Sequence, residues 1–314
     1  MTQQLPTLDA PLRIGTRGSP LALAQAYETR DRLARAFDLP HEVFQIVVIK
    51  TTGDAVQDRP LKEIGGKGLF TREIEDDLLQ GRIDIAVHSM KDMPVQQPAG
   101  LLLDTYLPRE DVRDAFVSPT KSALTELAVG ATVGTSSLRR KAQLLNRRPD
   151  LNVVEFRGNV QTRLRKLDEG VADCTFLAMA GLNRLKRDDV PATPISEDSM
   201  LPAVAQGAIG IERRTFDTRT ADMLAAIHDT PTGERLAAER AFLTALDGSC
   251  ETPIAGLAEL DNGQLRLRGE VLRPDGSERI HDDQACDIKD GAELGQAMAE
   301  KLLAEAGEGF FDWH

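Results

Sequence analysis

The stretch from Ile83 to Pro94, IDIAVHSMKDMP, places the functional edge of a predicted sheet. Its first half alternates and is rich in β-branched residues, which predicts a buried strand. Pro94 prevents the chain from continuing as either a helix or a central strand. Lys91 and Asp92 therefore follow the end of a strand, where open α/β sheets bind their ligands. A single Lys-Asp pair is more often a solvated turn, so other residues have to decide between the two interpretations.

Size and composition predict a soluble globular protein of two or three domains. The chain has 314 residues, of which 41% are hydrophobic and 28% charged. Aromatic residues make up only 4%, which argues against stacking platforms for single-stranded nucleic acid. The 38 basic and 50 acidic residues give a net charge of −12, which disfavours a nucleic-acid or anionic-membrane partner. A locally basic cleft is compatible with that total.

The N-terminal segment and the cysteines predict a cytoplasmic location. Met1 to Leu12 contains neither the basic region nor the apolar core of a signal peptide, and no apolar run is long enough to span a bilayer. Cys174, Cys250 and Cys286 are an odd number at wide spacing, which is typical neither of a disulfide framework nor of a Cys-x-x-Cys metal site. The five histidines are scattered without metal-ligand spacing, so we expect no metal.

The chain begins with a predicted strand over Leu12 to Thr16 and a helix that starts at Ser19-Pro20. Ser19 is a good N-cap, and proline suits the first helical position. Because Arg17 and Ser19 flank the helix N-terminus, this loop is a candidate anion site. An ordinary capped loop explains the pattern equally well.

A predicted polar loop over Gly53 to Pro60 is followed by a glycine-rich stretch, IGGKGLF over 64–70, which opens a further predicted helix. It is not a P-loop, because Leu61 stands where the first glycine is required and Gly68 where serine or threonine is required. The glycines around Lys67 suggest a mobile loop that touches an anion. A plain flexible connection is nearly as consistent with the sequence.

Three motifs of the first half recur in the same order in the second half. The Ile-Gly-Thr and Val-Gly-Thr motifs that end at Thr16 and Thr135 each precede a capped helix, the second from Ser136 onward. Similar helix starts follow Gly68 and Gly158, and the next strands follow Gly81 and Gly170. We therefore predict two α/β lobes of related design, each a sheet with helices on its faces.

Two chain crossings predict the domain boundaries. The polar segment Leu107 to Asp111 leads out of the first lobe, and the Gly- and Pro-punctuated segment Met200 to Ile211 leads back. Two crossings imply a hinged cleft, which is the usual geometry for enclosing a small polar ligand. A small α+β domain follows, with a predicted strand pair around turns at Asn262-Gly263 and Pro274-Asp275-Gly276. The predicted domains are a first lobe over 12–107 completed by 207–226, a second lobe over 112–202, and a C-terminal domain over 231–314.

Arginines gather near the helix starts of the predicted second lobe. They are Arg139, Arg140, Arg157, Arg163 and Arg184. Arginine forks suit carboxylate or phosphate groups, and helix N-termini add partial positive charge. Each arginine alone is more often part of a solvated helix face. As a set, in a chain of net charge −12, they favour a cleft for a polyanion.

Asp92 and Cys250 are the candidate reactive residues. Neighbouring cations hold a carboxylate ionised, and in a closed site it can stabilise a substrate cation or move a proton. Cys250 lies in a Gly-Ser-Cys-Glu turn, where an accessible thiolate can act as a nucleophile. Cys174 lies inside an apolar strand and is expected in the core.

These motifs together resemble those of the porphobilinogen deaminase family, whose members are also called hydroxymethylbilane synthases. The resemblance runs from about Leu12 to the C-terminal helix. It rests on RIGTRGSPLAL at 13–23, GGKGLF at 65–70, AVHSMKD at 86–92, VGTSSLRR at 133–140, RGNV at 157–160, QG at 206–207 and GSC at 248–250. It implies two lobes that resemble periplasmic binding proteins and a small third domain.

The resemblance also implies the reaction. Four porphobilinogen molecules would be joined in turn, each with loss of ammonia, and hydroxymethylbilane would be released by hydrolysis. Growth would start on a dipyrromethane cofactor attached through a thioether to Cys250. Deamination would give an electron-poor azafulvene, whose positive charge Asp92 would stabilise while relaying protons. The partners would be porphobilinogen and the growing polypyrrole chain, and the protein is expected to act as a cytoplasmic monomer.

Carried over by position, the resemblance assigns a role to each site residue. The cofactor would be held by Lys91, Asp92, Ser137, Arg139, Arg140 and Arg163. The incoming or growing chain would be held by Arg17, Ser19, Arg157, Arg163 and Arg184. Lys67 and Phe70 would belong to a loop that covers the site. Glu63 departs from the pattern, because some relatives have a lysine there, and this leaves the loop's share of binding open.

Two functions of other classes are weaker interpretations. A non-catalytic binding or effector-sensing protein built on the same lobes would explain the hinge and the arginines, but it gives no role to Asp92 or Cys250. A phosphoryl-transfer enzyme lacks support because the sequence has no complete P-loop or metal-carboxylate motif. DNA binding is disfavoured by the charge and by the absence of a recognisable reading motif.

Overall fold

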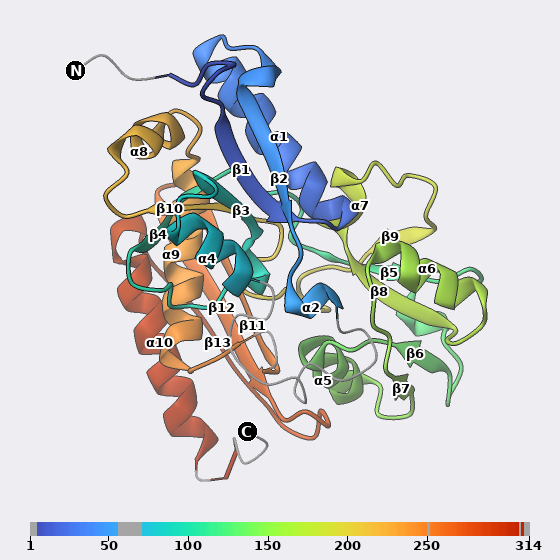
Figure 1. Ribbon diagram of the computed structural model, residues 1–314. Helices are drawn as coiled ribbons and strands as arrows, with labels where there is room; N and C mark the ends of the chain where they lie inside the picture. The colour runs from blue at the N-terminus through green and yellow to red at the C-terminus, as the bar shows by residue number, and fades with distance from the viewer. Residues whose placement is uncertain (1–4, 56–70, 250–251, 308, 311–314) are drawn as a thin grey trace. The chain divides into compact units, whose positions relative to one another are not determined.

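A computed structural model describes residues 5–55, 71–249, 252–307 and 309–310 of the chain (Figure 1). These residues form two five-stranded sheets and one three-stranded sheet. The chain divides into two compact units. The first consists of Met1–Glu110 and Ala208–Gly233, and the second of Asp111–Gly207 and Glu234–His314.

The sheet of the first unit has the strand order β2-β1-β3-β10-β4. β1 (Leu12–Arg17) pairs in parallel with β2 (Phe44–Ile49) and with β3 (Ile85–Ser89). β10 (Ile209–Arg214) is antiparallel both to β3 and to β4 (Leu101–Tyr106). The predicted strands over Leu12–Thr16 and from Ile83 are therefore confirmed, and they lie side by side.

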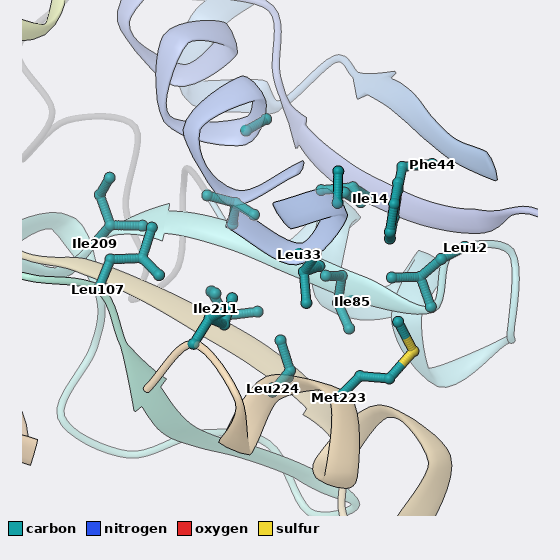
Figure 2. Packing of buried hydrophobic residues seen from close by; sticks show 14 of the residues in the cluster. Leu12, Ile14, Leu33, Phe44, Ile85, Leu107, Ile209, Ile211, Met223 and Leu224 are labelled. Atoms are coloured by element: carbon teal, nitrogen blue, oxygen red, sulfur yellow. The ribbon is translucent and has the colours of Figure 1, made fainter. Parts of the chain in front are cut away.

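Helices cover both faces of this sheet. On one face, side chains of α1 (Pro20–Phe37) and α8 (Thr218–Ala225) complete a core cluster with the strands. Figure 2 shows Leu33 of α1 and Met223 and Leu224 of α8 beside the buried strand residues. On the other face, α4 (Arg72–Leu79) contributes Ile74 and Leu78 to a second cluster.

The remaining elements of the first unit are short, apart from the start of α9 (Thr230–Ala245), which runs on into the second unit. Two single turns, η1 (His41–Val43) and η2 (Met90–Asp92), precede β2 and follow β3. Residues 53–60 were expected to be a polar loop, whereas α2 (Thr52–Ala55) forms one helical turn at their start. The predicted start of α4 at Gly68 lies outside the described residues.

The five-stranded sheet of the second unit has the order β7-β6-β8-β5-β9, which matches the first sheet strand for strand. β6 (Thr132–Gly134) is parallel to β7 (Asn152–Val154) and β8 (Cys174–Ala178). β5 (Asp114–Val117) is antiparallel to β8 and to β9 (Ala192–Pro194). The sequence repeat therefore reflects two lobes of the same α/β design, as predicted.

The helices of this lobe again divide between the two faces of the sheet. α5 (Leu138–Arg147) packs on one face, whereas α6 (Val160–Asp168) and α7 (Met179–Arg184) pack on the other. A short turn, η3 (Leu124–Glu126), precedes β6. The helix cap differs from the expectation. Ser137, one residue after the predicted start, caps α5 by accepting a hydrogen bond from the Arg140 backbone N–H.

Gly15 and Gly134 are the glycines of the repeated Ile-Gly-Thr and Val-Gly-Thr motifs, and close packing explains why both motifs have glycine there. A Cβ on Gly15 of β1 would lie 2.3 Å from the Ile83 side chain, and a Cβ on Gly134 of β6 would lie 2.5 Å from the Phe156 ring. Both contacts are far below a van der Waals distance. In each lobe the missing side chain lets a neighbouring apolar group pack directly against the backbone of β1 or β6.

The last part of the chain forms a small α+β arrangement. β11 (Ile254–Asp261), β12 (Gln264–Leu272) and β13 (Arg279–Asp287) make an antiparallel sheet. A pair of strands was expected here. Each of the two predicted turns, at Asn262-Gly263 and Pro274-Gly276, connects one strand to the next, so the sheet has three strands. Phe242 of α9 and Met298 of α10 (Gly291–Ala306) approach the sheet at Gly269. A single turn, η4 (Ile288–Asp290), leads from β13 into α10.

Candidate active site

Asp92 is positioned by a tight turn at the end of a buried strand. β3 ends at Ser89, and η2 follows it at once. The Met90 backbone N–H donates to the carbonyl of Ala208 at 3.0 Å, and the Met93 N–H donates to the carbonyl of Met90 at 3.2 Å. The predicted end of the strand is therefore confirmed, and the turn is tied to the start of the neighbouring β10.

Asp92 lines a pocket of the first unit with residues from two other segments. The polar residues of the lining are Arg17, Ser19, Gln25, Thr71, His88, Ser89 and Asp92. β1 and β3 are parallel neighbours, so their carboxyl ends lie at the same edge of the sheet. The structure thus brings together three sequence-predicted residues, Arg17, Ser19 and Asp92. Lys91 is half-buried in the same turn but does not line this pocket.

The start of α1 gives this pocket a fixed hydroxyl and a fixed amide. Ser19 caps the helix, because its Oγ accepts from the Ala22 backbone N–H at 3.2 Å. One turn further, Gln25 Nε2 donates to Ser89 Oγ at 2.8 Å. Gln25 is buried, so this bond joins α1 to the end of β3 directly behind the pocket. The polar groups of the pocket are therefore held by neighbouring elements before any ligand binds.

In the second unit, the candidate arginines follow three adjacent parallel strands. Arg139 and Arg140 lie in the first turn of α5 after β6, Arg157 precedes α6 after β7, and Arg184 ends α7 after β8. The strands are neighbours in the order β7-β6-β8, so these segments leave the sheet at one edge. That edge corresponds to the one that carries Asp92 in the first sheet. The proposed cleft between the lobes stays a prediction.

Arg139 and Arg140 share one buried carboxylate. Arg140 donates to Asp114 Oδ1 from Nε at 3.1 Å and from Nη2 at 2.7 Å. Arg139 Nη1 lies 2.7 Å from Asp114 Oδ2 as an ion pair and donates to the carbonyl of Leu201 at 2.8 Å. The side chains of the two arginines are only 5% and 6% exposed, and that of Asp114 is 0% exposed. Both guanidiniums are therefore fixed before any ligand binds.

This arrangement shifts the pKa values of the buried groups. Burial alone would raise the pKa of Asp114, but the charges of Arg139 and Arg140 outweigh it and hold that pKa well below its usual range. Burial lowers the pKa of Arg140, with a contribution from the neighbouring Arg139. The three groups carry two positive charges and one negative charge. The cluster therefore has an excess of positive charge that suits an anionic ligand.

The other candidate arginines are partly exposed, and the guanidiniums of two of them donate to backbone carbonyls. Arg163 Nε donates to the carbonyl of Gly158 at 2.9 Å, and Arg184 Nη2 donates to that of Gly207 at 3.0 Å. The carbonyl of Arg157 accepts from Lys166 Nζ at 3.0 Å. All three arginine side chains are half-buried. They can reach solvent or a ligand, in contrast to the enclosed pair at the start of α5.

Several predicted residues lie outside the described part of the chain. They are Cys250, the loop residues Lys67 and Phe70, and Glu63. Ser249 and Thr252, on either side of residues 250–251, are hydrogen-bonded to each other. The Ser249 backbone N–H donates to Thr252 Oγ1 at 3.0 Å, and the Thr252 N–H donates to the carbonyl of Ser249 at 3.2 Å.

The two described cysteines are poor nucleophiles. Cys174 is fully buried, as expected for a core residue, and burial raises the pKa of its thiol to about 12. Burial also raises the pKa of Cys286, with a contribution from nearby Asp290. A thiol with a raised pKa carries little thiolate at neutral pH. Neither residue therefore competes with Cys250 as the candidate nucleophile.

Other features of the described residues do not point to a different active site. A larger pocket, of about 190 Å³, lies on the charged face of the C-terminal sheet and contains none of the predicted site residues. Among the residues with described positions, no group of three or more His, Cys, Asp or Glu is arranged to hold a metal. In the same part of the chain, no helix is long and apolar enough to cross a membrane.

Comparison with known proteins decides the family. The sequence model of the porphobilinogen deaminase dipyrromethane-cofactor-binding domain matches residues 12–222, and that of the porphobilinogen deaminase C-terminal domain matches residues 234–304. The chain belongs to the porphobilinogen deaminase family. Its activity is that of a hydroxymethylbilane synthase, a transferase of tetrapyrrole and haem biosynthesis that works with a dipyrromethane cofactor.

Porphobilinogen deaminases from distant sources are similar over nearly the whole chain. One from Paracoccus denitrificans is 66% identical over 310 residues, which cover 99% of each chain. A chloroplastic one from Oryza sativa is 54% identical and covers 96% of this chain and 86% of its own. A substrate-binding protein of an ABC transporter from Coxiella burnetii aligns with a TM-score of 0.41 at 15% identity over 73% of this chain and 96% of its own, which is too distant to carry an argument.

The arrangement around Arg139 fits the porphobilinogen deaminase cofactor. A dipyrromethane carries acetate and propionate groups, so its site needs donors for carboxylates. Arg139 Nε is a buried donor that has no hydrogen-bond partner within the described part of the chain, and the arginine pair around Asp114 has excess positive charge. An orphaned donor of this kind is costly without an acceptor. The donors present therefore suit a carboxylate ligand.

Sequence reasoning missed the residues that support the site. Asp114, Gln25, His88 and Glu212 were not singled out for a function. One signal was present for Gln25, because the Ala-Gln pair that contains it recurs at Gln143 in the second lobe. Gln143 is also buried and exchanges two hydrogen bonds with the backbone of Leu201, each at 2.8 Å. For Asp114 no comparable repeat was available.

Proposed function

We propose that Asp92 is the catalytic carboxylate and that Cys250 carries the cofactor in the stepwise, head-to-tail condensation of four porphobilinogen molecules. The observation that carries this proposal is the first-unit pocket, in which Asp92 lines the same surface as Arg17 and Ser19. A carboxylate beside a guanidinium and a fixed hydroxyl suits a substrate that has both carboxylates and a reacting centre that becomes cationic.

Asp92 acts on the charge that develops during the reaction. Loss of ammonia from porphobilinogen leaves positive charge on its ring system, and an ionised carboxylate in a partly enclosed pocket stabilises that charge. The half-buried position of Asp92 limits competition from water. Each addition also releases one proton from the attacking ring carbon, and Asp92 is placed to accept it.

The arginines bind the substrate's carboxylates and those of the growing chain. Arg17, Ser19, Arg157, Arg163 and Arg184 are the proposed contacts. Support comes from their positions at strand ends and from the partial exposure of their side chains. A chain that grows by one porphobilinogen unit gains two carboxylates at each step. Several separate cations are therefore needed rather than one deep pocket.

The proposed cofactor contacts are Lys91, Asp92, Ser137, Arg139, Arg140 and Arg163, with Cys250 as the covalent attachment. When bound, the dipyrromethane supplies the pyrrole carbon from which growth starts. Support for Cys250 comes from the raised pKa values of the two described cysteines, which make them poor nucleophiles. Lys67 and Phe70 are proposed to cover the site.

We also propose that the protein works as a monomer in the cytoplasm. Cys174 and Cys286 are free thiols, which suits a reducing compartment. The net charge of −12 makes a nucleic-acid partner unfavourable. Size-exclusion chromatography with light scattering tests whether the protein is a monomer, because a dimer would give a measured mass twice that of one chain.

The denatured intact mass of the purified protein tests the assignment of Cys250. Excess mass equal to two pyrrole units is expected in the natural chain and is expected to be absent from Cys250→Ser. Cys286→Ser is the matched control and should retain the excess. Loss of the excess from Cys286→Ser, or its presence in Cys250→Ser, would contradict the assignment. If none of the proteins carries it, incubation with porphobilinogen followed by a second mass distinguishes the apo form from a protein that cannot be loaded.

A further inference from the structure

The pocket of about 190 Å³ in the second unit lies on one face of the C-terminal sheet. A Cβ on Gly269 of β12 would meet side chains of α9 and α10, so this position of the strand faces the helices. Arg268 and Glu270, on either side of it, therefore project from the opposite face, and both line the pocket. The register places Asp283 and His281 of β13 directly opposite them, which extends the same polar face.

The second lobe supplies the other wall of this pocket. Arg147, the last residue of α5, donates to the carbonyl of Ser199 and, at 2.7 Å, to that of Asp198. Leu201 packs on apolar side chains of β11. Arg147, Asp198 and Leu201 all line the pocket, and they belong to the same compact unit as the C-terminal sheet. The two walls are therefore parts of one unit and are joined by direct contacts.

Ion pairs hold Arg268 and Glu270 in place. Arg268 Nη1 donates to Asp198 Oδ1 at 2.7 Å, and its Nη2 lies 3.0 Å from Glu259 Oε2. Glu270 Oε2 accepts from Arg279 Nε at 2.6 Å. The side chains of Arg268 and Glu270 are only 13% and 2% exposed. Each side chain is therefore enclosed and held by charged neighbours before any ligand binds.

Each of these two side chains keeps one polar atom unmatched. Arg268 Nε and Glu270 Oε1 are buried, and neither has a hydrogen-bond partner among the described residues. The guanidinium N–H can only donate, and a carboxylate oxygen can only accept. A buried donor or acceptor without a partner costs free energy. Because the residues are two positions apart on β12, the unmatched donor and the unmatched acceptor belong to neighbouring positions of one face.

Charge and size restrict the ligand that this pocket suits. Four arginines and five carboxylates line it, so the charges nearly balance, in contrast to the excess positive charge around Arg139 and Arg140. A polyanion such as the growing chain is therefore disfavoured. A zwitterion leaves the balance unchanged and brings both an acceptor and a donor. The volume equals that of roughly six water molecules, which suits one small molecule rather than a chain.

We propose that this pocket is a second binding site, which takes a small zwitterion. The carboxylate of the ligand accepts from Arg268 Nε, and its ammonium group donates to Glu270 Oε1. Two sources supply this chemistry, a free amino acid and porphobilinogen itself, which carries an aminomethyl group and carboxylates. The pocket contains none of the residues proposed for catalysis or cofactor binding, so the inference does not depend on the roles of Asp92 and Cys250.

The test follows the Arg268 Nε–H signal by NMR in the cofactor-loaded, 15N-arginine-labelled enzyme. The signal is identified by its absence from Arg268→Lys. Glycine and L-glutamate are the amino-acid probes, and acetate and methylammonium each carry only one of the two charges. A zwitterion should shift the signal saturably at millimolar concentration, and both single-charge compounds should bind at least about tenfold more weakly. Porphobilinogen, added in large excess to loaded Asp92→Asn, distinguishes the two sources.

Glu270→Gln should weaken zwitterion binding at least about tenfold, because the charge that receives the ammonium group is lost. Glu278→Gln is the matched control. The Glu278 carboxylate likewise accepts from an arginine Nε, that of Arg273 at 2.9 Å, but it does not line the pocket. This variant should bind as the natural protein does. Thermal unfolding confirms that each variant is folded, and a bound zwitterion should also raise the Tm of the natural protein.

No saturable shift with any zwitterion would overturn the inference, and this is the result expected if water alone serves the two unmatched atoms. Equal affinity for acetate or methylammonium would also overturn it, as would unchanged affinity in folded Glu270→Gln. If Glu270→Gln does not fold, the comparison of zwitterions with single-charge probes in the natural protein still decides the question. Consumption of porphobilinogen by loaded Asp92→Asn would count against the proposed function and not against this site.

Discussion

Arg140 donates two hydrogen bonds to a single oxygen of Asp114, from Nε at 3.1 Å and from Nη2 at 2.7 Å. Asp114 is the first residue of β5, close to the point where the chain enters the second unit. Gln206, close to where the chain leaves that unit, donates to the same carboxylate oxygen at 3.0 Å. One buried carboxylate therefore links both chain crossings to the arginines proposed to hold the cofactor.

Asp114→Asn should destabilise the protein strongly. Removing one partner of a buried ion pair costs about 3–5 kcal/mol, because the remaining charges stay buried without compensation. Urea unfolding at neutral pH measures this loss. Asp150→Asn is the control, because Asp150 pairs with Arg148 on the surface, and it should change stability little. Equal losses in the two variants would contradict the role assigned to Asp114.

The carboxylate of Asp114 also makes the stability of the protein depend on pH in the acidic range. The pKa of Asp114 is lower in the folded state than its unfolded value of about 3.9, so its contribution is present above that value and is lost as pH falls towards the folded pKa. The free energy of unfolding should therefore fall less steeply below about pH 4 in Asp114→Asn than in the natural protein. If the free energy of unfolding depended on pH in the same way in both proteins, the pKa of Asp114 would not be lowered in the folded state.

Asp92→Asn should nearly abolish turnover while carboxylate binding survives. The substitution removes the charge but preserves the shape, so kcat should fall by at least about a hundredfold with little change in the affinity for porphobilinogen. Stopped assays of hydroxymethylbilane formation and equilibrium binding of porphobilinogen separate the two effects. Ordinary turnover in a loaded Asp92→Asn enzyme would remove its assigned role.

Arg139→Leu should impair retention or assembly of the cofactor. Nε of Arg139 is a buried donor without a hydrogen-bond partner among the described residues, and leucine removes it together with the charge. Intact mass of the purified variant should show little or no excess of two pyrrole units. Arg165→Leu removes an arginine that is 69% exposed on α6 and should load normally. A fully loaded, active Arg139→Leu would count against the arginine assignment.

Gly276→Ala should disturb the support of α5 from the C-terminal sheet. Gly276 has φ +75°, and a Cβ there would lie 2.5 Å from Asn146 N and 2.8 Å from Ala142 O. Left-handed strain of about 1–2 kcal/mol adds to about 1–3 kcal/mol from overpacking against backbone. Gly263→Ala is matched in φ, at +79°, but meets nothing within 4 Å, so it should show only the strain. Thermal unfolding compares the two, and equal losses would contradict the packing explanation.

The sequence alone was sufficient to predict local structure and the repetition of one α/β design in two lobes. Ser19-Pro20 signalled the start of α1, and Asn262-Gly263 signalled a tight turn between two strands, because capping and turn chemistry depend on adjacent residues. The matching strand orders of the two sheets agree with the repeated Gly-Thr motifs. The long family motifs predicted the reaction class, and they include the positions proposed to be reactive.

Only the tertiary structure determined how the site is supported. Asp114 lies 26 residues before Arg140 and Glu212 lies 124 residues after His88, and both partners meet because strands from distant segments are adjacent in a sheet. Strand order and register are set by the packing of whole faces, which no local pattern encodes. The sequence thus identified the residues proposed to face the substrate, whereas the buried charges beside them became visible only once the sheets were assembled.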